Sequence, residues 1–198
     1  KNINIYLLSG VISKNDLKDI KNSKVIPIIN NIDQLSLLNS SQKLNYILHV
    51  DTGMNRLGFH TSELEKYSNL INKRNIIFLM SHLSSADDLN KNESNKQLKK
   101  LIEINKKFNL PLSIANSSGI FLGKKFHLNY VRPGKSLYGI NPFYKKNFNL
   151  RQVMSIYSPI LQIQNVNKGS SIGYSQTYKL KKNLKVATID FGYSDGFL

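Results

Sequence analysis

The sequence contains no cysteine and no tryptophan. Without cysteine, disulfides and thiolate metal ligands are excluded, and a reducing compartment such as the cytoplasm is favoured. No apolar run approaches the roughly 20 residues that span a bilayer, so we expect no membrane anchor. The chain begins at Lys1 with neither an initiator Met nor a signal-peptide pattern. We therefore expect a cytoplasmic polypeptide that is a fragment of a longer one.

Acidic residues are also few, since 12 Asp and Glu stand against 28 Lys and Arg and leave a formal net charge of +16. An imbalance of this size is typical of proteins that bind nucleic acids. However, Lys, Asn and Ile are used heavily throughout, as AT-rich codon usage would produce, and the lysines are dispersed or lie on predicted helix faces. We therefore favour a solvated basic surface without a nucleic-acid partner. A nucleic-acid module is kept as an alternative.

Short apolar runs rich in β-branched residues alternate with longer stretches of helical period up to about residue 140. The clear runs cover residues 5–8, 25–29, 46–50, 76–80 and 110–115, and a weaker sixth run ends at Val131-Arg132. This alternation predicts βα units and a parallel sheet.

Two helices are predicted most clearly between these runs. Ser62-Glu63-Leu64-Glu65 carries a hydroxyl and a carboxylate that can satisfy the free N–H groups of a first turn, so a helix is expected from there to about Asn72. From Glu93 to Phe108, apolar residues recur every three or four positions. That spacing predicts a helix packed on the outside of a sheet.

The pattern changes after Pro142. Residues 153–166 and 184–189 are predicted to be strands, and the turn-like segment Asn167-Lys168-Gly169-Ser170 lies between them without a helical pattern. We therefore expect a second, β-rich domain that begins near residue 148.

Polar residues gather just after the predicted strands, where parallel βα folds carry their chemistry. The segments that follow four consecutive runs are residues 51–59, 81–88, 116–119 and 132–134. Taken singly, each has a structural explanation as a turn, a cap, a permissive glycine or a core histidine. Together they predict a convergent pocket for an anion. Residues 116–119 and 132–134 offer N–H groups and hydroxyls that suit a phosphate.

Five motifs, in their content, order and spacing, closely resemble those of alanine racemases. They are Asp51-Thr52-Gly53-Met54-Asn55-Arg56-Leu57-Gly58, Ala115-Asn116-Ser117, Val131-Arg132-Pro133-Gly134, Ile172-Gly173-Tyr174-Ser175 and Gly192-Tyr193-Ser194-Asp195-Gly196. The resemblance extends over essentially the whole chain. It implies an enzyme that interconverts L-alanine and D-alanine with pyridoxal 5′-phosphate (PLP), for peptidoglycan precursor supply.

The same resemblance implies the domain organisation. Residues 1–147 would form a partial (β/α)8 barrel of the TIM type, with its first strands missing and with PLP bound at the strand ends. Residues 148–198 would form the N-terminal part of a C-terminal β domain. The family resemblance further implies a homodimer with shared active sites, and it implies no metal.

The resemblance implies five residues around the cofactor. Arg132 would donate to the pyridine nitrogen and keep it from being protonated, which makes the ring a weaker electron sink. Ser117 and the N–H of Gly134 would hold the phosphate, while Asn116 shapes that loop. His82 would lie beside the ring and link Arg132 to the catalytic tyrosine.

Substrate binding and proton transfer are assigned in the same way. Arg56 would contact the phenolic oxygen of the cofactor and the substrate carboxylate. Tyr174 would exchange the α-proton on one face of the substrate, reaching across the dimer into the partner's site, while a lysine acts on the other face. Tyr193 and Asp195 would flank the substrate entrance.

The sequence departs from the family pattern at two points. No segment resembles the Lys-Ala-(Asn/Asp)-Ala-Tyr-Gly stretch whose lysine forms the Schiff base with PLP, so the fragment alone is expected to be inactive. His49 stands where many members have a carbamylated lysine that orients the arginine equivalent to Arg56. Either His49, a bound anion or another carboxylate positions Arg56, or His49 is purely structural.

Two alternatives stay open within the PLP-binding class. One is a racemase of another amino acid, because the residues that set side-chain specificity lie partly outside this sequence. The other is a non-catalytic PLP-binding barrel protein. Such proteins use a similar barrel but lack the β domain and its tyrosine, which residues 153–198 are expected to supply.

Overall fold

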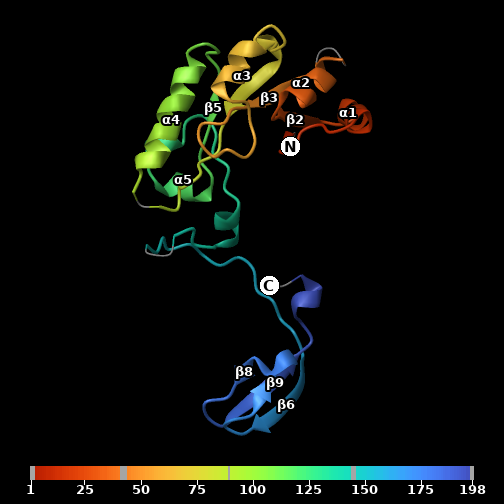
Figure 1. The fold of residues 1–198 in the computed structure, drawn as a ribbon, viewed down its shortest axis with the longest axis vertical. Coiled ribbons are helices and arrows are strands. Elements are labelled where there is room, and N and C mark those ends of the chain that lie inside the picture. The colour runs from red at the N-terminus through yellow and green to blue at the C-terminus, as the bar shows by residue number, and fades with distance from the viewer. Residues whose placement is uncertain (1–2, 41–43, 89, 144–145, 197–198) are drawn as a thin grey trace. The chain divides into compact units, whose positions relative to one another are not determined.

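The computed structural model describes residues 3–40, 44–88, 90–143 and 146–196, and the chain divides into two compact units, Lys1–Val153 and Met154–Leu198. The first unit contains a parallel five-stranded sheet in the order β1-β2-β3-β4-β5 (Figure 1). Its strands are β1 (Ile5–Leu7), β2 (Val25–Ile29), β3 (Tyr46–His49), β4 (Ile76–Met80) and β5 (Leu112–Ser113). A parallel bridge between Ser113 and Tyr130 adds the sixth predicted segment beside β5. The expected fold class, a partial α/β barrel, is confirmed.

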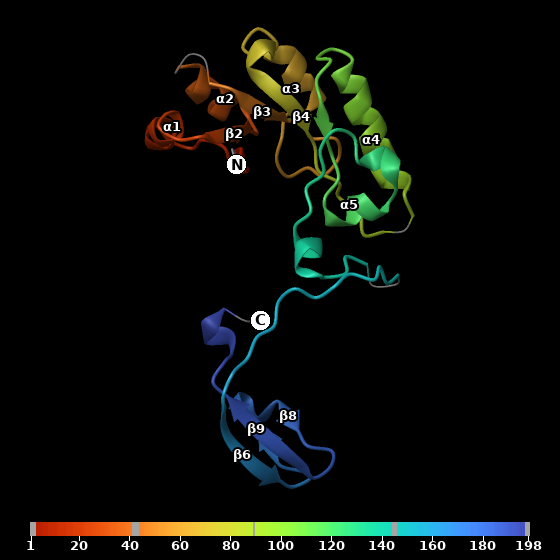
Figure 2. The same cartoon turned by 180° about the vertical axis from the view of Figure 1, so that it is seen from behind.

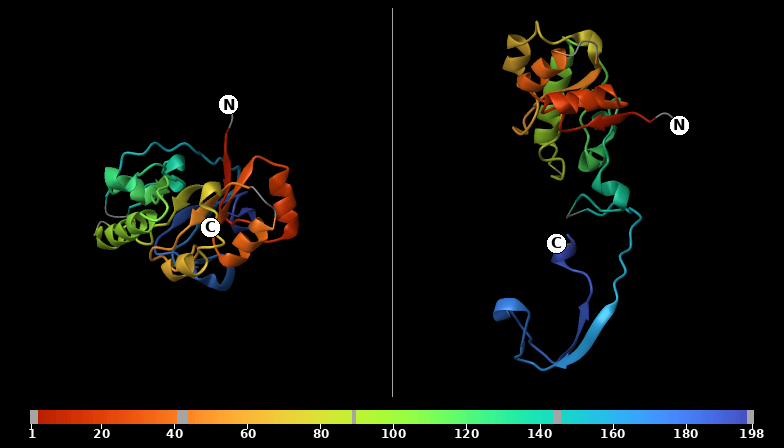
Figure 3. Two further views of the ribbon diagram at one scale, coloured as in Figure 1. Left: turned by 90° about the horizontal axis from the view of Figure 1, so that it is seen from above. Right: turned by 90° about the vertical axis from the view of Figure 1, so that its right-hand side faces the viewer.

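In the described part of the chain, five α-helices connect or follow these strands. They are α1 (Lys14–Lys21), α2 (Ile32–Asn39), α3 (Thr61–Lys66), α4 (Asn92–Asn105) and α5 (Ser117–Phe121). Seen from above, α1 to α4 lie along the outer side of the curled sheet (Figure 3). The N-terminus of α1 is fixed by a capping box, because the hydroxyl of Ser13 accepts from the N–H of Asp16 at 3.1 Å and the Asp16 carboxylate accepts from the N–H of Ser13 at 2.9 Å.

The two faces of the sheet bury different clusters. The larger cluster lies between the sheet and the helices and includes Leu48 and Leu101, both fully buried. The smaller cluster consists of Ile28, Ile47, Phe78 and Met80. Because alternate residues of a strand point to opposite faces, this second cluster forms the inner surface of the partial barrel. His49 follows Ile47 on that inner face.

Two predicted elements have different limits in the structure. The helix expected from Ser62 begins at Thr61 and ends at Lys66, because the Glu63 carboxylate caps the N–H of His60 at 2.9 Å and tighter turns replace the helix after Lys66. The strand expected over residues 153–166 is only Ile160–Val166. Pro159 precedes it and lacks the N–H that a longer ladder would need.

The second unit is an antiparallel β structure. Strand β6 (Ile160–Val166) pairs with β9 (Leu184–Ile189), and β7 (Ser171–Ile172) pairs with β8 (Tyr178–Lys179); Figure 2 shows β6, β8 and β9. Single 3-10 turns hold Tyr174–Gln176 and Tyr193–Asp195. The domain boundary expected between residues 147 and 148 stays a prediction. Among the described residues, no helix is both long and apolar enough to span a bilayer.

Candidate functional site

Backbone hydrogen bonds continue past the strand ends and bring the polar segments side by side. The N–H of Val50 donates to the carbonyl of Met80 at 2.8 Å. The N–H of Ser81 donates to the carbonyl of Ser113, and the N–H of Arg132 donates to the carbonyl of Ala115, both at 2.9 Å. The segments that follow three strands therefore meet at one edge of the sheet.

Arg132 is the centre of this edge. Its guanidinium donates to the hydroxyl of Ser113 and, at 2.6 Å, to the carbonyl oxygen of Ser81. One of its nitrogens also lies 3.4 Å from Nδ1 of His82. Burial lowers the pKa of Arg132 to about 10, so the side chain still carries its charge at neutral pH. The positively charged guanidinium of Arg132 is therefore held in place by uncharged hydrogen-bond acceptors.

His82 is held neutral by its surroundings. Burial, and then the charges of Arg132 and Arg56, lower the pKa of His82 to about 4. Its two ring nitrogens face donors, because Arg132 lies at Nδ1 and the amide nitrogen of Asn116 lies 3.4 Å from Nε2. A neutral imidazole accepts at one nitrogen only, and the charged guanidinium is the stronger donor. We therefore place the proton on Nε2.

Ser117 and Ser136 form a hydroxyl cradle beside Gly134. The hydroxyl oxygen of Ser117 accepts from the N–H of Gly134 at 2.8 Å and from the N–H of Ser136 at 3.3 Å, which leaves its own proton to donate. The hydroxyl of Ser136 is buried without a partner among the described residues. Asn116 caps the adjoining α5, since its side-chain oxygen accepts from the N–H of Gly119 at 2.9 Å. Two hydroxyl donors and a glycine without a Cβ suit a phosphate group.

Arg56 lies on the loop of residues 51–58, which is closed at its base. The N–H of Phe59 donates to the carbonyl of His49, and the N–H of Asp51 donates to the carbonyl of Phe59, both at 2.9 Å. The Asp51 carboxylate accepts from the N–H groups of Gly53 at 2.7 Å and Met54 at 2.9 Å. Arg56 itself is exposed, and its charge contributes to the low pKa of both His49 and His82.

His49 belongs to a second network that the sequence did not reveal. Its Nδ1 lies 2.7 Å from the side-chain oxygen of Asn30, and the Asn30 amide nitrogen donates to the carbonyls of Leu8 and Ile28 at 3.1 and 3.2 Å. Burial first, and then the nearby charge of Arg132, lower the pKa of His49 to about 4. Asn30 directly follows β2, so the strand-end rule that singled out the other segments also points to it.

The remaining predicted site residues lie in the second unit. Tyr174 is 89% exposed and Tyr193 is 76% exposed. The Asp195 carboxylate accepts from the N–H of Gly192 at 2.9 Å. The structure thus brings together His82, Asn116, Ser117, Arg132 and Gly134 within the first unit, and it describes Tyr174, Tyr193 and Asp195 by themselves.

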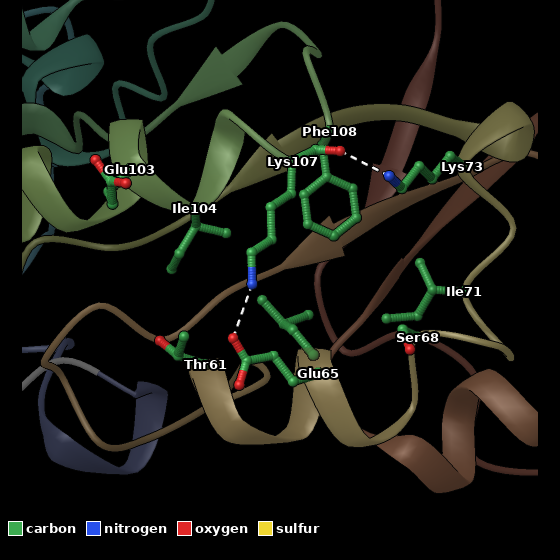
Figure 4. A pocket seen from close by; sticks show the side chains of 10 residues that line it. Thr61, Glu65, Ser68, Ile71, Lys73, Glu103, Ile104, Lys107 and Phe108 are labelled. Atoms are coloured by element: carbon green, nitrogen blue, oxygen red, sulfur yellow. Dashed lines mark hydrogen bonds and ion pairs between the residues drawn. The ribbon is translucent and has the colours of Figure 1, made fainter.

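A separate cavity of about 500 Å³ lies between α3 and α4 (Figure 4). Its walls include Leu64 and Phe108, and Lys107 crosses it to form an ion pair with Glu65 at 2.7 Å. Lys73 and Phe108 precede β4 and β5, so this cavity lies toward the opposite strand ends from Arg132. No cluster of His, Asp or Glu that could hold a metal ion occurs in the described part of the chain.

Comparison with known proteins gives one family throughout. The profile described as "Alanine racemase, N-terminal domain" matches residues 2–142, and the profile "Alanine racemase, C-terminal domain" matches residues 153–198. An alanine racemase of Rickettsia bellii is 38% identical over 98% of this chain and 50% of that protein. One of Vesicomyosocius okutanii is 35% identical over 98% of this chain and 56% of that protein. The chain thus spans about half the length of these relatives.

Solved structures agree with the sequence relatives. The alanine racemase of Bartonella henselae with covalently bound pyridoxal phosphate has a TM-score of 0.79 and 30% identity, over 99% of this chain and 57% of that one. The biosynthetic alanine racemase of Pseudomonas aeruginosa has a TM-score of 0.86 and 25% identity, over 100% of this chain and 57% of that one. By its fold and by both profiles, this chain belongs to the alanine racemase family.

Proposed function

We propose that the full-length protein is a PLP-dependent alanine racemase and that residues 1–147 form the cofactor-binding side of its active site. The observation that carries the proposal is the pairing of Arg132 with neutral His82 beside the hydroxyl cradle of Ser117 and Ser136. This arrangement occurs in a chain of the alanine racemase family, and a relative of known structure holds pyridoxal phosphate covalently.

The described residues fit the two ends of PLP. Ser117 and Ser136 offer hydroxyl donors, and Gly134 leaves open space in front of them, since a Cβ there would have only the Ser117 hydroxyl within reach, at 4.0 Å. Arg132 stays cationic and would donate to the pyridine nitrogen. When bound, PLP supplies the electron sink that accommodates the charge left after the α-proton departs. Arg132 would donate a hydrogen bond to the pyridine nitrogen without transferring its proton. The nitrogen would therefore stay unprotonated, which makes the ring a weaker electron sink.

The remaining roles follow from the family. Arg56, on its tethered loop, would bind the substrate carboxylate. The hydroxyl of Tyr174 would hold and return the α-proton on one face, in the partner's site of a homodimer, with Tyr193 and Asp195 at the entrance. A lysine outside these 198 residues would act on the other face, and the fragment alone would be inactive. A cytoplasmic enzyme of this kind would supply D-alanine for peptidoglycan.

Polarimetry on the full-length protein tests the proposal. With PLP present, the optical rotation of L-alanine and of D-alanine should decay to the same value of zero, and other amino acids should racemise more slowly. Faster racemisation of another amino acid would favour the racemase of different specificity. Tight PLP binding without racemisation of any amino acid would favour the non-catalytic carrier and overturn the proposal.

A further inference from the structure

Gln97 is a buried polar residue on a helix outside the barrel, yet it reaches the loops of the site. It lies on α4 and is 3% exposed. Its amide nitrogen donates to the carbonyl of His82 at 2.9 Å and lies 3.4 Å from the hydroxyl of Thr52. Its amide oxygen accepts from both the N–H and the hydroxyl of Ser84, at 2.9 and 3.1 Å. The oxygen and the nitrogen of the Gln97 amide therefore both form hydrogen bonds.

These contacts determine the orientation of the amide. The oxygen faces the backbone N–H of Ser84, and the nitrogen faces a carbonyl oxygen, so exchanging the two would place donor against donor and acceptor against acceptor. A buried amide that loses such partners leaves several groups unsatisfied at once. This position therefore requires a side chain with the length of glutamine and with both its hydrogen-bond donor and its acceptor.

The contacts of Gln97 lead to the residues of the site. Thr52 lies in the loop that carries Arg56, and its hydroxyl lies 2.7 Å from the hydroxyl of Ser81. The carbonyl of Ser81 is the acceptor of Arg132 at 2.6 Å. Gln97 also packs under the same loop, because a Cβ on Gly53 would lie 3.5 Å from its side chain. The side chain of Gln97 therefore connects, from α4, the loop after β3 with the loop after β4.

We propose that Gln97 is a positioning residue, which sets the placement of the Arg56 loop relative to His82 and Arg132. It does so through hydrogen bonds from α4, without contact to substrate or cofactor. The effect on catalysis rests on the proposed racemase function, whereas the effect on the two loops does not.

Two variants and a matched control test this role in the full-length protein with PLP. Gln97→Met keeps the length of the side chain and removes all its hydrogen bonds. Gln97→Glu keeps an acceptor for Ser84 but cannot donate to His82 when ionised, and it serves if the Met variant does not fold. Ser94→Ala is the control, because Ser94 is a fully buried residue of the same helix whose hydroxyl has no partner among the described residues.

Hydrogen–deuterium exchange is the readout that a general loss of stability would not mimic. Either Gln97 variant should exchange about tenfold faster in the segments 50–59 and 80–88, while strands β2 and β6 and the Ser94→Ala protein remain as in the wild type. The same variants should lower kcat/KM for alanine. Unchanged exchange in both segments, or equal acceleration throughout the protein, would overturn the inference. Absence of racemisation in the wild type would refute the proposed function but leave the exchange comparison intact.

Discussion

Nδ1 of His49 lies 2.7 Å from Oδ1 of Asn30 at the end of β3. Because the Asn30 amide nitrogen is committed to the carbonyls of Leu8 and Ile28, its oxygen is the atom that faces the ring. An oxygen can only accept here, so Nδ1 carries the proton and Nε2 is the bare nitrogen of a neutral ring. The side chain of Asn30 thereby connects the ends of the three neighbouring strands β1, β2 and β3.

Replacing Asn30 by Leu should destabilise the full-length protein by about 1–3 kcal/mol, because His49 and two backbone carbonyls lose buried partners. Urea unfolding measures the effect. Asn39→Leu is a suitable control, since the side chain of Asn39 is exposed and its hydrogen bond, to the carbonyl of Leu70, lies at the surface. Equal effects of the two substitutions would contradict the importance of the His49 network.

Acid should destabilise the folded protein through its histidines. The folded pKa of His49 is about 4, below the ordinary 6.5, so the unfolded chain binds the proton more readily. Stability from this group is complete above pH 6.5 and is lost as the pH falls toward 4, by on the order of 3 kcal/mol. His82 adds less, because solvent screens a partly exposed group. Urea midpoints that fall clearly less between pH 7 and 4.5 in His49→Asn than in the wild type would verify the assignment. A parallel fall in both would refute it.

Arg132→Met should raise the pKa of both His49 and His82, because the charge of Arg132 is a cause of their low values. Neither should return to the ordinary value, since burial is the larger cause for each. NMR titration of histidine Cε1–H signals follows the change, with Arg74→Met as an exposed-charge control. Unshifted titrations of His49 and His82 would show that Arg132 does not lie beside them.

Ser117→Ala should weaken PLP binding about tenfold or more, because a charge-assisted hydrogen bond is lost and two N–H groups lose their acceptor. Ser118→Ala is the matched control, since Ser118 is the next residue along α5 and is equally buried. Fluorescence titration of the apoprotein with PLP gives both affinities. Similar affinities of the two variants for PLP would show that Ser117 does not bind the phosphate.

Much of the fold follows from local sequence patterns. Runs such as Val25–Ile29 and Ile76–Met80 are strands in the structure because β-branched apolar residues fill both faces of a covered parallel sheet. The predicted limits of α3 were wrong because Glu63, rather than the Ser62 hydroxyl, caps the helix at the N–H of His60 and because tighter turns replace the helix after Lys66. The late start of strand β6, at Ile160, has a similarly local cause in Pro159.

The candidate site was only partly predictable. The strand-end rule brought out His82, Ser117 and Arg132, because their positions depend on sheet topology alone. It did not bring out Gln97, which reaches the site from the middle of a helix and looks like any polar helix residue in sequence. Its contacts exist only after α4 packs against two loops, and no local spacing encodes that packing.

Exchange of the α-proton in deuterated water, measured in the full-length protein with PLP, tests most directly whether the Arg132 site and Tyr174 serve one racemisation. The wild type should incorporate deuterium into L-alanine and D-alanine alike. Tyr174→Phe keeps the ring and removes only the hydroxyl, so PLP should still bind while exchange falls strongly for one enantiomer and much less for the other. Tyr178→Phe, a nearby exposed tyrosine, should leave both rates unchanged. Equal loss for both enantiomers, or full exchange of both in Tyr174→Phe, would contradict the two-sided mechanism.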